Sequence, residues 1–209
     1  MTADTILTLA NSRGVDLTDP GGDVDFTVIA EHLAKVKRYN GATPGIEYSV
    51  AQHSVMGADA AFRDTNSRDL AGYFLLHDGH EAFLGDDTTP KKRALAEIAR
   101  RNFGVLSDDI MNSFRVLEDQ FDETIHRAAG LAWPPEPSIK SAVKTYDLVM
   151  FVTEWRDLMR GVKHPNWDPY RDVDPLRDPI GPWSWQISAG AFIDRCKRYL
   201  PTFTTGDES

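Results

Sequence analysis

The most nearly continuous apolar run of the chain, residues 70–76, is followed at once by two histidines, an aspartate and a glutamate. A helix that is apolar on every side is a buried one, so the run predicts a buried helix over about 69–84. Ionisable groups beside such a helix persist only when they are paired, hydrogen-bonded or bound to metal. Helical spacing would place His77 and Glu81 on one face. The pattern therefore predicts a metal site at the end of a buried helix.

Periodicity and capping signals predict further helices on both sides of this run. Ser49 followed by Gln52 is a capping box, Asn40-Gly41 is a helix stop, and Thr89-Pro90 is typical of a helix start. No segment shows the alternation of apolar and polar residues expected of a strand, so the chain is predicted to be all-α. The predicted helices span about 28–38, 50–62, 69–84, 89–104, 107–125, 138–159 and 185–200.

Length and composition indicate one globular domain over residues 1–209, since 41% of the residues are hydrophobic and 26% are charged. Its core is expected over about 25–160. The proline-rich segment 161–183 is long for a loop inside a domain, and such loops tend to be functional or disordered. Its Trp167 and Tyr170 would either cover a pocket or simply clamp an irregular surface segment, and the second interpretation is favoured.

The charge balance restricts the partners of the protein. A formal net charge of −9 argues against a broad nucleic-acid footprint. Small phosphorylated substrates stay compatible with it, because local basic residues or a metal ion override the overall sign. The single Cys196 excludes an internal disulfide framework.

Neither a membrane span nor a secretion signal is expected. No apolar stretch reaches the roughly 18 residues that a membrane-spanning helix needs. The first residues, Met-Thr-Ala-Asp, lack the basic and apolar regions of a signal peptide. The expected compartment is the cytoplasm.

Two further ionisable residues fall on apolar stripes of separate predicted helices. His53, in mid-helix, would by itself usually be a hydrogen-bonded core histidine. Asp147 lies between Val143 and Met150 in helical spacing, where a carboxylate costs several kcal/mol unless it is compensated. For Asp147 alone, an arginine partner is a slightly better explanation than a metal.

Taken together, these residues favour a divalent metal ion. His53, the pair His77-Asp78 and Asp147 form an H…HD…D pattern over three predicted helices. Mixed imidazole and carboxylate ligands suit Mn, Co, Ni, Zn or Fe better than Ca.

The pattern and its flanking sequences resemble a known enzyme family. Tyr48-Ser-Val-Ala-Gln-His-Ser-Val55, Leu75-Leu-His-Asp-Gly-His-Glu-Ala-Phe-Leu-Gly-Asp86 and Thr88-Thr-Pro-Lys-Lys92 resemble HD-domain metal-dependent phosphohydrolases. The similarity is to the 5′-deoxynucleotidase branch and to related phage and bacterial deoxynucleoside triphosphohydrolases. It runs from about residue 25 to residue 159.

The resemblance implies a helical HD domain, one bound divalent ion, a small nucleotide as substrate and a homodimer. It implies two acids near the metal-side water and the phosphate, Glu81 and Asp86, and an arginine on the phosphate, Arg38. Tyr39 falls where the monophosphatases tend to carry Trp, so its contact with sugar or base is left open. The implied metal ligands are His53, His77, Asp78 and Asp147.

Lys91 and Lys92 fall at the predicted start of the helix that contains Pro90, where free N–H groups favour anions. A solvated helix face is the alternative for both. It is favoured for Lys91, and the two interpretations are balanced for Lys92. His80, one residue off the metal face, is expected behind the metal ligands or at the surface.

The favoured function is hydrolysis of 2′-deoxynucleotides with release of phosphate from deoxynucleoside 5′-monophosphates. The alternatives are a deoxynucleoside triphosphate triphosphohydrolase and a non-catalytic HD-fold module that binds metal or nucleotide. A pure metal scaffold has no need of Glu81, Asp86 and Arg38, so the sequence favours an enzyme.

Overall fold

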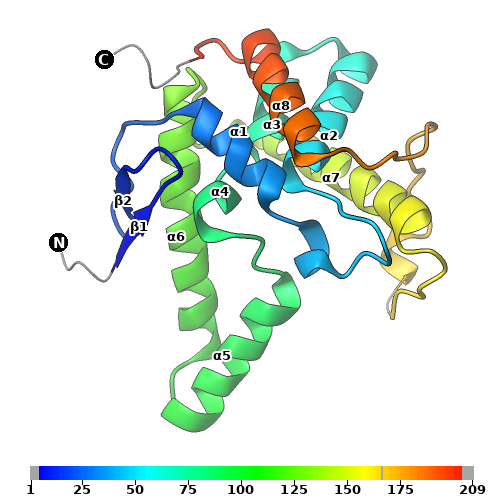
Figure 1. Ribbon diagram of the computed structural model, residues 1–209. Coiled ribbons are helices and arrows are strands. Elements are labelled where there is room, and N and C mark those ends of the chain that lie inside the picture. The colour runs from blue at the N-terminus through cyan, green and yellow to red at the C-terminus, as the bar shows by residue number, and fades with distance from the viewer. Residues whose placement is uncertain (1–4, 166, 204–209) are drawn as a thin grey trace.

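Helices dominate the computed structural model, which describes residues 5–165 and 167–203 (Figure 1). The predicted all-α class is confirmed. The described residues also contain a small antiparallel hairpin of β1 (Ile6–Thr8) and β2 (Gly14–Asp16), with Leu7 opposite Val15. No strand pattern predicted this hairpin, because three-residue strands are too short to show an alternating pattern.

The core lies where α2, α3 and α8 pack together, with α1 against α8 and α7 against α2 and α3. Its largest fully buried side chains include Phe74, Phe192 and Leu33. None of the described helices is both long and apolar enough to cross a membrane. The helices are α1 (Phe26–Lys35), α2 (Val50–Thr65), α3 (Arg68–Leu76), α4 (Glu81–Leu84), α5 (Thr89–Phe103), α6 (Ser107–Ala128), α7 (Pro137–Leu158) and α8 (Trp185–Tyr199), with short 3-10 turns η2 (Arg38–Gly41) and η3 (Asp168–Tyr170).

The capping signal at Ser49 is confirmed in part. The Ser49 hydroxyl accepts a hydrogen bond from the Gln52 backbone N–H at 3.2 Å, as in a capping box. The Gln52 side chain does not return to the helix start. It donates to the Gly181 carbonyl at 2.8 Å and accepts from the Trp183 N–H at 3.0 Å, so it ties the end of the 161–183 segment to α2.

The first predicted helix ends earlier than expected, at Lys35 instead of Arg38. After it the chain is extended and pairs with the residues before α2. The Arg38 N–H bonds the Tyr48 carbonyl at 3.0 Å, and the Val50 N–H bonds the Val36 carbonyl at 3.1 Å. Arg38 therefore opens a separate turn, η2, and does not end a helix.

The helix predicted over 69–84 is two helices, α3 and α4, with a tight turn between them. The turn closes through bonds from the Gly79 N–H to the Leu76 carbonyl and from the Glu81 N–H to the Asp78 carbonyl. A Cβ at Gly79 would lie 2.9 Å from that Leu76 oxygen and 3.2 Å from Ile125 of α6. The turn therefore has room only for glycine at position 79, and because it interrupts the helix, His77 and Glu81 do not share one helical face.

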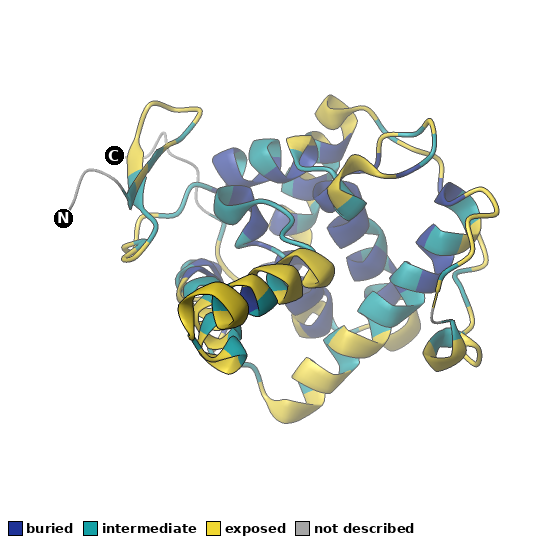
Figure 2. Ribbon diagram, turned by 90° about the horizontal axis from the view of Figure 1, so that it is seen from below, coloured by how far each residue is buried: buried dark blue, intermediate teal, exposed yellow. Residues whose placement is uncertain are grey.

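The segment 161–183 is held by aromatic packing against α7. The ring of Tyr170 lies 4.6 Å from that of Phe151, and the ring of His164 lies 4.7 Å from that of Trp155, both between centroids. Trp167 joins the same cluster, 6.3 Å from Trp155. The predicted aromatic clamp is confirmed, and the segment also borders a cleft described below. The helix α5 projects below the core in the view of Figure 1, and most of its surface is exposed (Figure 2).

Candidate metal centre

Three of the predicted ligands converge on one point from α2, the end of α3 and α7. Nε2 of His53 lies 3.3 Å from Nε2 of His77 and 3.4 Å from Oδ1 of Asp147. Nε2 of His77 lies 3.8 Å from the same carboxylate oxygen. His53, His77 and Asp147 form a group that could hold a metal ion.

The spacing of these three atoms suits a shared ion. Two atoms bound at about 2.1 Å and separated by an angle between 90° and 109° lie about 3.0–3.4 Å apart. The separations of 3.3 and 3.4 Å fall in this range, and the third, 3.8 Å, needs only a small side-chain movement. The donor set of two imidazoles and a carboxylate is the one predicted for a first-row divalent metal.

Both imidazole rings are oriented with Nε2 toward the centre. Nδ1 of His77 lies 2.6 Å from the Phe74 carbonyl oxygen, and Nδ1 of His53 lies 2.6 Å from Oε1 of Glu154. A carbonyl or carboxylate oxygen only accepts, so each Nδ1 carries a proton, and in the neutral ring Nε2 then offers its lone pair toward the centre. Hydrogen bonds of this kind fix the tautomer of metal-binding histidines.

Asp78, the fourth predicted ligand, lies beside this group. Its Oδ2 is 3.3 Å from Nε2 of His77 and 3.8 Å from Nε2 of His53, and it accepts a hydrogen bond from Nη1 of Arg38 at 3.1 Å. Burial raises the pKa of Asp78, but the charges of His77 and Arg38 outweigh it and the pKa is lowered. Asp78 therefore links the metal group to the predicted phosphate-binding arginine.

The Asp147 side chain is less buried than its position on an apolar stripe predicted, because 45% of it is exposed to solvent. The outer part of α7 is open to solvent here. Burial raises the pKa of Asp147, yet its hydrogen bonds to His53 and His77 outweigh this and lower the pKa. Its partners are the two histidines, so the alternative of an arginine partner is not what the structure shows.

Glu154 belongs to the site and was not predicted from the sequence. Its side chain is fully buried, with Oε1 on His53 and Oε2 accepting from the Tyr39 hydroxyl and, at 3.3 Å, from Nε of Arg38. Burial raises its pKa, but the charges of Arg38 and His53 lower it. Glu154 follows Asp147 by seven residues, two helical turns, so a second carboxylate on the same stripe of α7 was the signal available.

Glu81 is buried and its Oε2 has no hydrogen-bond partner among the described residues. Burial, together with the charges of Asp78 and Asp86, raises the pKa of Glu81 to about 10. In the metal-free protein its carboxyl group therefore holds a proton at neutral pH. A buried, unpaired carboxyl group of this kind is suited to proton transfer.

Arg38, Tyr39 and Asp86 line a cleft of about 880 Å³ on one side of this group. Arg93 and the aromatic residues Trp155, His164 and Tyr170 belong to the same cleft.

Tyr39 and Asn40, in the turn that carries Arg38, have positive φ angles of 57° and 53°, which L side chains rarely adopt. Burial raises the pKa of Asp86, while Arg38 and hydrogen bonds from the backbone of Asn40 and Tyr39 oppose this. Asp86 thus also holds the turn that carries Arg38.

Three other residues considered from the sequence lie outside the cleft of Arg38, namely Lys92, Lys91 and His80. Lys92 forms an ion pair with Glu118 of α6 and lines a separate small cavity with Glu81, so the structure does not bring it into the cleft of Arg38. Lys91 pairs with Asp87 on the exposed side of α5. His80 is not at the surface: its side chain is mostly buried, and its Nδ1 lies 2.9 Å from Oδ1 of Asp122.

Binding of a divalent ion to this group is expected to release protons. Burial opposes protonation of His77, but the charges of Asp78 and Asp147 raise its pKa to about 9. The metal-binding form of His77 is neutral, so below that pH its proton must leave. Titration calorimetry with Mn²⁺ or Zn²⁺ in buffers of different ionisation enthalpy should show proton release at pH 7, with affinity rising toward pH 9. An affinity that is constant from pH 6 to 9 would contradict this.

No family model matches the chain. It is similar to an uncharacterized protein of Rhodobacter capsulatus, with 33% identity over 148 residues, which are 68% of this chain and 66% of that protein. It is also similar to the uncharacterized protein YfdR of Escherichia coli, with 30% identity over 136 residues, 65% of this chain and 62% of that protein. The matches thus span just under two thirds of the length of these relatives, whose names state no activity.

Proposed function

We propose that this protein is an HD-domain metal-dependent phosphohydrolase that releases phosphate from 2′-deoxynucleoside 5′-monophosphates. One observation carries the proposal: a metal-competent group of His53, His77 and Asp147 is linked through Asp78 to an arginine at the edge of a large cleft. Phosphoryl transfer needs positive charge around the non-bridging oxygens and a positioned nucleophile, and in this proposal Arg38 supplies the charge and the metal group holds the nucleophilic water.

The residues fit a divalent ion. His53, His77 and Asp147 would hold it, with Asp78 as the fourth ligand. When bound, such an ion lowers the pKa of water and polarises a phosphoryl oxygen. Glu154 keeps His53 in the tautomer that this requires.

Arg38 is placed to bind the phosphate. Its Nε bonds Glu154 and its Nη1 bonds Asp78, so the guanidinium plane is fixed by two carboxylates. Nη2 forms no hydrogen bond within residues 5–165 and 167–203, which leaves it available to an anion in the cleft. A fixed guanidinium can grip two phosphate oxygens, which an ammonium group cannot reproduce.

Glu81 supplies the proton transfer in this proposal. As a neutral acid it can protonate a leaving oxygen, and as a carboxylate it can orient a water molecule. Its position next to Asp78 rather than among the three ligand atoms leaves its carboxyl group free for this work.

The direct test is hydrolysis by purified protein supplied with Mn²⁺, Co²⁺, Ni²⁺, Zn²⁺ or Fe²⁺. The substrates are the four deoxynucleoside monophosphates and triphosphates, and the phosphate product is identified. Orthophosphate and free deoxynucleoside from the monophosphates are expected. Stoichiometric metal binding without hydrolysis of any nucleotide would instead make the protein a binding module.

Triphosphate hydrolysis is the second candidate, and the size of the cleft favours it. A volume of about 880 Å³ exceeds what one phosphate needs, and Arg93 lines it together with Arg38. Two arginines suit the extra phosphates of a deoxynucleoside triphosphate. Release of tripolyphosphate, and not of orthophosphate, would identify this reaction.

Replacement of Arg38 by Lys is expected to lower kcat/KM for the preferred nucleotide roughly 10- to 100-fold, because a charge-assisted hydrogen bond contributes about 1.5–3 kcal/mol. The same change breaks a buried contact with Glu154, so a lower melting temperature is expected too. Metal content should stay at one ion per chain. Arg63→Lys, on an exposed arginine of α2, is the matched control. Unchanged kcat/KM in Arg38→Lys would make Arg38 purely structural.

A further inference from the structure

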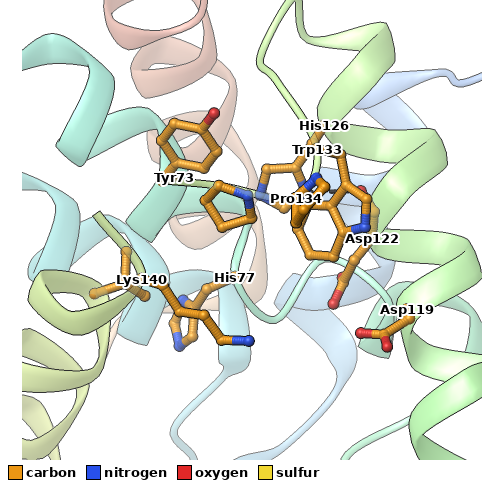
Figure 3. Close-up of a pocket in the computed structure, with 10 residues that line it drawn as sticks. Tyr73, His77, Asp119, Asp122, His126, Trp133, Pro134 and Lys140 are labelled. Carbon is orange, nitrogen blue, oxygen red and sulfur yellow. Dashed lines mark hydrogen bonds between the residues drawn. The ribbon is translucent and has the colours of Figure 1, made fainter. Parts of the chain in front are cut away.

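A second cavity borders the metal group on the side of His77 (Figure 3). It has a volume of about 300 Å³ and lies between α3, α6, α7 and the segment that joins α6 to α7. It shares none of its lining residues with the cleft that contains Arg38. No step of the proposed hydrolysis described above uses it.

The metal group lies between this cavity and the cleft along α7. Lys140 lines the cavity, Asp147 belongs to the metal group, and Glu154 bonds the Arg38 and Tyr39 of the cleft. These three residues follow one another at intervals of seven, so they lie on one face of the helix in steps of about 10 Å. A phosphate bound at the metal group would therefore have the cleft on one side and this cavity on the other. Each lies within the length of a nucleotide.

Four of the ten residues that line the cavity carry aromatic rings, namely Tyr73, His77, His126 and Trp133. The ring of His126 lies 4.7 Å from that of Trp133 and 5.6 Å from that of Tyr73, the latter pair stacked at an interplanar angle of 24°. Figure 3 shows the rings of Trp133 and Pro134 gathered on one side, with His77 and Lys140 on the other. The flat face of an aromatic ring such as that of Trp133 stacks on heterocyclic bases of any sequence.

Among the polar side chains that line this cavity, hydrogen-bond acceptors outnumber donors. Nδ1 of His126 donates to the Asp122 carbonyl at 2.7 Å, so its Nε2 is an acceptor. Burial lowers the pKa of His126 and so favours the neutral ring. Asp119 and Asp122 add carboxylates, of which Asp119 forms no ion pair within the described chain, while Lys140 is the cationic donor.

We propose that this cavity, called the aromatic cavity from here on, binds the base of the nucleotide and prefers bases with an exocyclic amino group. The inference rests on the proposed function and adds the location of the base. An amino group of adenine, guanine or cytosine would donate to the carboxylates, whereas thymine carries no such group. The volume accommodates one ring system with part of its sugar.

The charged groups that line the cleft and the aromatic cavity indicate which part of the nucleotide each of them binds. The cleft presents the guanidinium groups of Arg38 and Arg93, which suit phosphate oxygens. The aromatic cavity presents the carboxylates of Asp119 and Asp122 against the one ammonium group of Lys140 among its lining residues, and these carboxylates repel phosphate and accept from amino groups. A nucleotide with its phosphate toward Arg38 therefore extends its base past His77 into the aromatic cavity.

The test compares substrates with and without a base. For the wild type and Trp133→Leu, kcat/KM is measured with dAMP and with deoxyribose 5-phosphate. Removal of a stacking ring costs about 1–3 kcal/mol per base, so the ratio of the two values should fall roughly tenfold or more in Trp133→Leu. Trp185→Leu, at the exposed start of α8, is the control and should keep the wild-type ratio. Asp119→Asn should narrow the preference for dAMP over dTMP.

Two results would overturn the assignment. One is an unchanged ratio in Trp133→Leu. The other is a fall of the ratio in Trp155→Leu, in the cleft, and not in Trp133→Leu, which would locate the base beside Arg38. If no nucleotide is hydrolysed, the proposed function fails, and calorimetric titration with dAMP still decides the location: binding lost in Trp133→Leu supports the aromatic cavity, and equal or absent binding excludes it.

Discussion

Replacement of Asp147 by Ala is expected to abolish stoichiometric binding of the divalent ion. The carboxylate is one of the three atoms that converge, and its loss leaves the ion with two imidazoles and Asp78, whose carboxylate also accepts from Arg38. Hydrolysis should fall by more than about 100-fold, since even changes to residues behind metal ligands cost 10- to 100-fold. Elemental analysis and titration calorimetry measure the metal, and steady-state kinetics measures the activity.

The fold should tolerate this change. The Asp147 side chain is 45% exposed, and partly exposed ion pairs contribute at most about 1 kcal/mol. The metal-free variant should therefore melt close to the metal-free wild type, while the stabilisation by added metal should be lost. Asp194→Ala, an exposed carboxylate on α8, is the matched control. One ion per chain in Asp147→Ala would remove Asp147 from the ligand set.

Replacement of Glu81 by Gln is expected to lower turnover on the order of 100-fold or more while metal content stays at one ion per chain. Gln keeps the shape of the side chain but cannot transfer a proton. The amide is neutral, as the protonated carboxyl group of Glu81 is. The variant therefore removes proton transfer and keeps the packing and charge of the side chain. Wild-type turnover in Glu81→Gln would exclude Glu81 from the chemistry, and loss of the metal would make it a ligand.

The stability of the same variant has a defined pH dependence in the metal-free protein. The pKa of Glu81 is about 10 in the folded chain and near 4.5 when unperturbed. A raised pKa contributes stability only at low pH, and this is lost as the pH rises, because folding must then take up a proton. Glu81→Gln removes that cost. Its melting temperature should exceed that of the wild type more at pH 8 than at pH 5, which calorimetric melting at the two pH values measures.

The positions of the helices follow from local features of the sequence. Capping by Ser49, the helix start at Thr89-Pro90 and the periodic apolar residues of α6 act within a few residues of one another. Local hydrogen bonds and hydrophobic periods of this kind can be read without knowledge of the fold. The same holds for the residue types of the metal group, because His and Asp on apolar stripes demand a partner wherever the helices pack.

Features that depend on distant contacts were decided by the tertiary structure. In the turn between α3 and α4, Ile125 of α6 lies so close to Gly79 that a side chain there would not fit. Lys92 pairs with Glu118, 26 residues away in the sequence, so its ammonium group does not line the cleft of Arg38.

The role of Glu154 is the clearest case. It bonds His53 and Arg38, from which it is separated by 101 and 116 residues. A sequence shows which side chains are ionisable, and helical spacing shows which of them share a face. The partner of a buried charge is set by which faces meet when the helices pack, and that is a property of the whole fold.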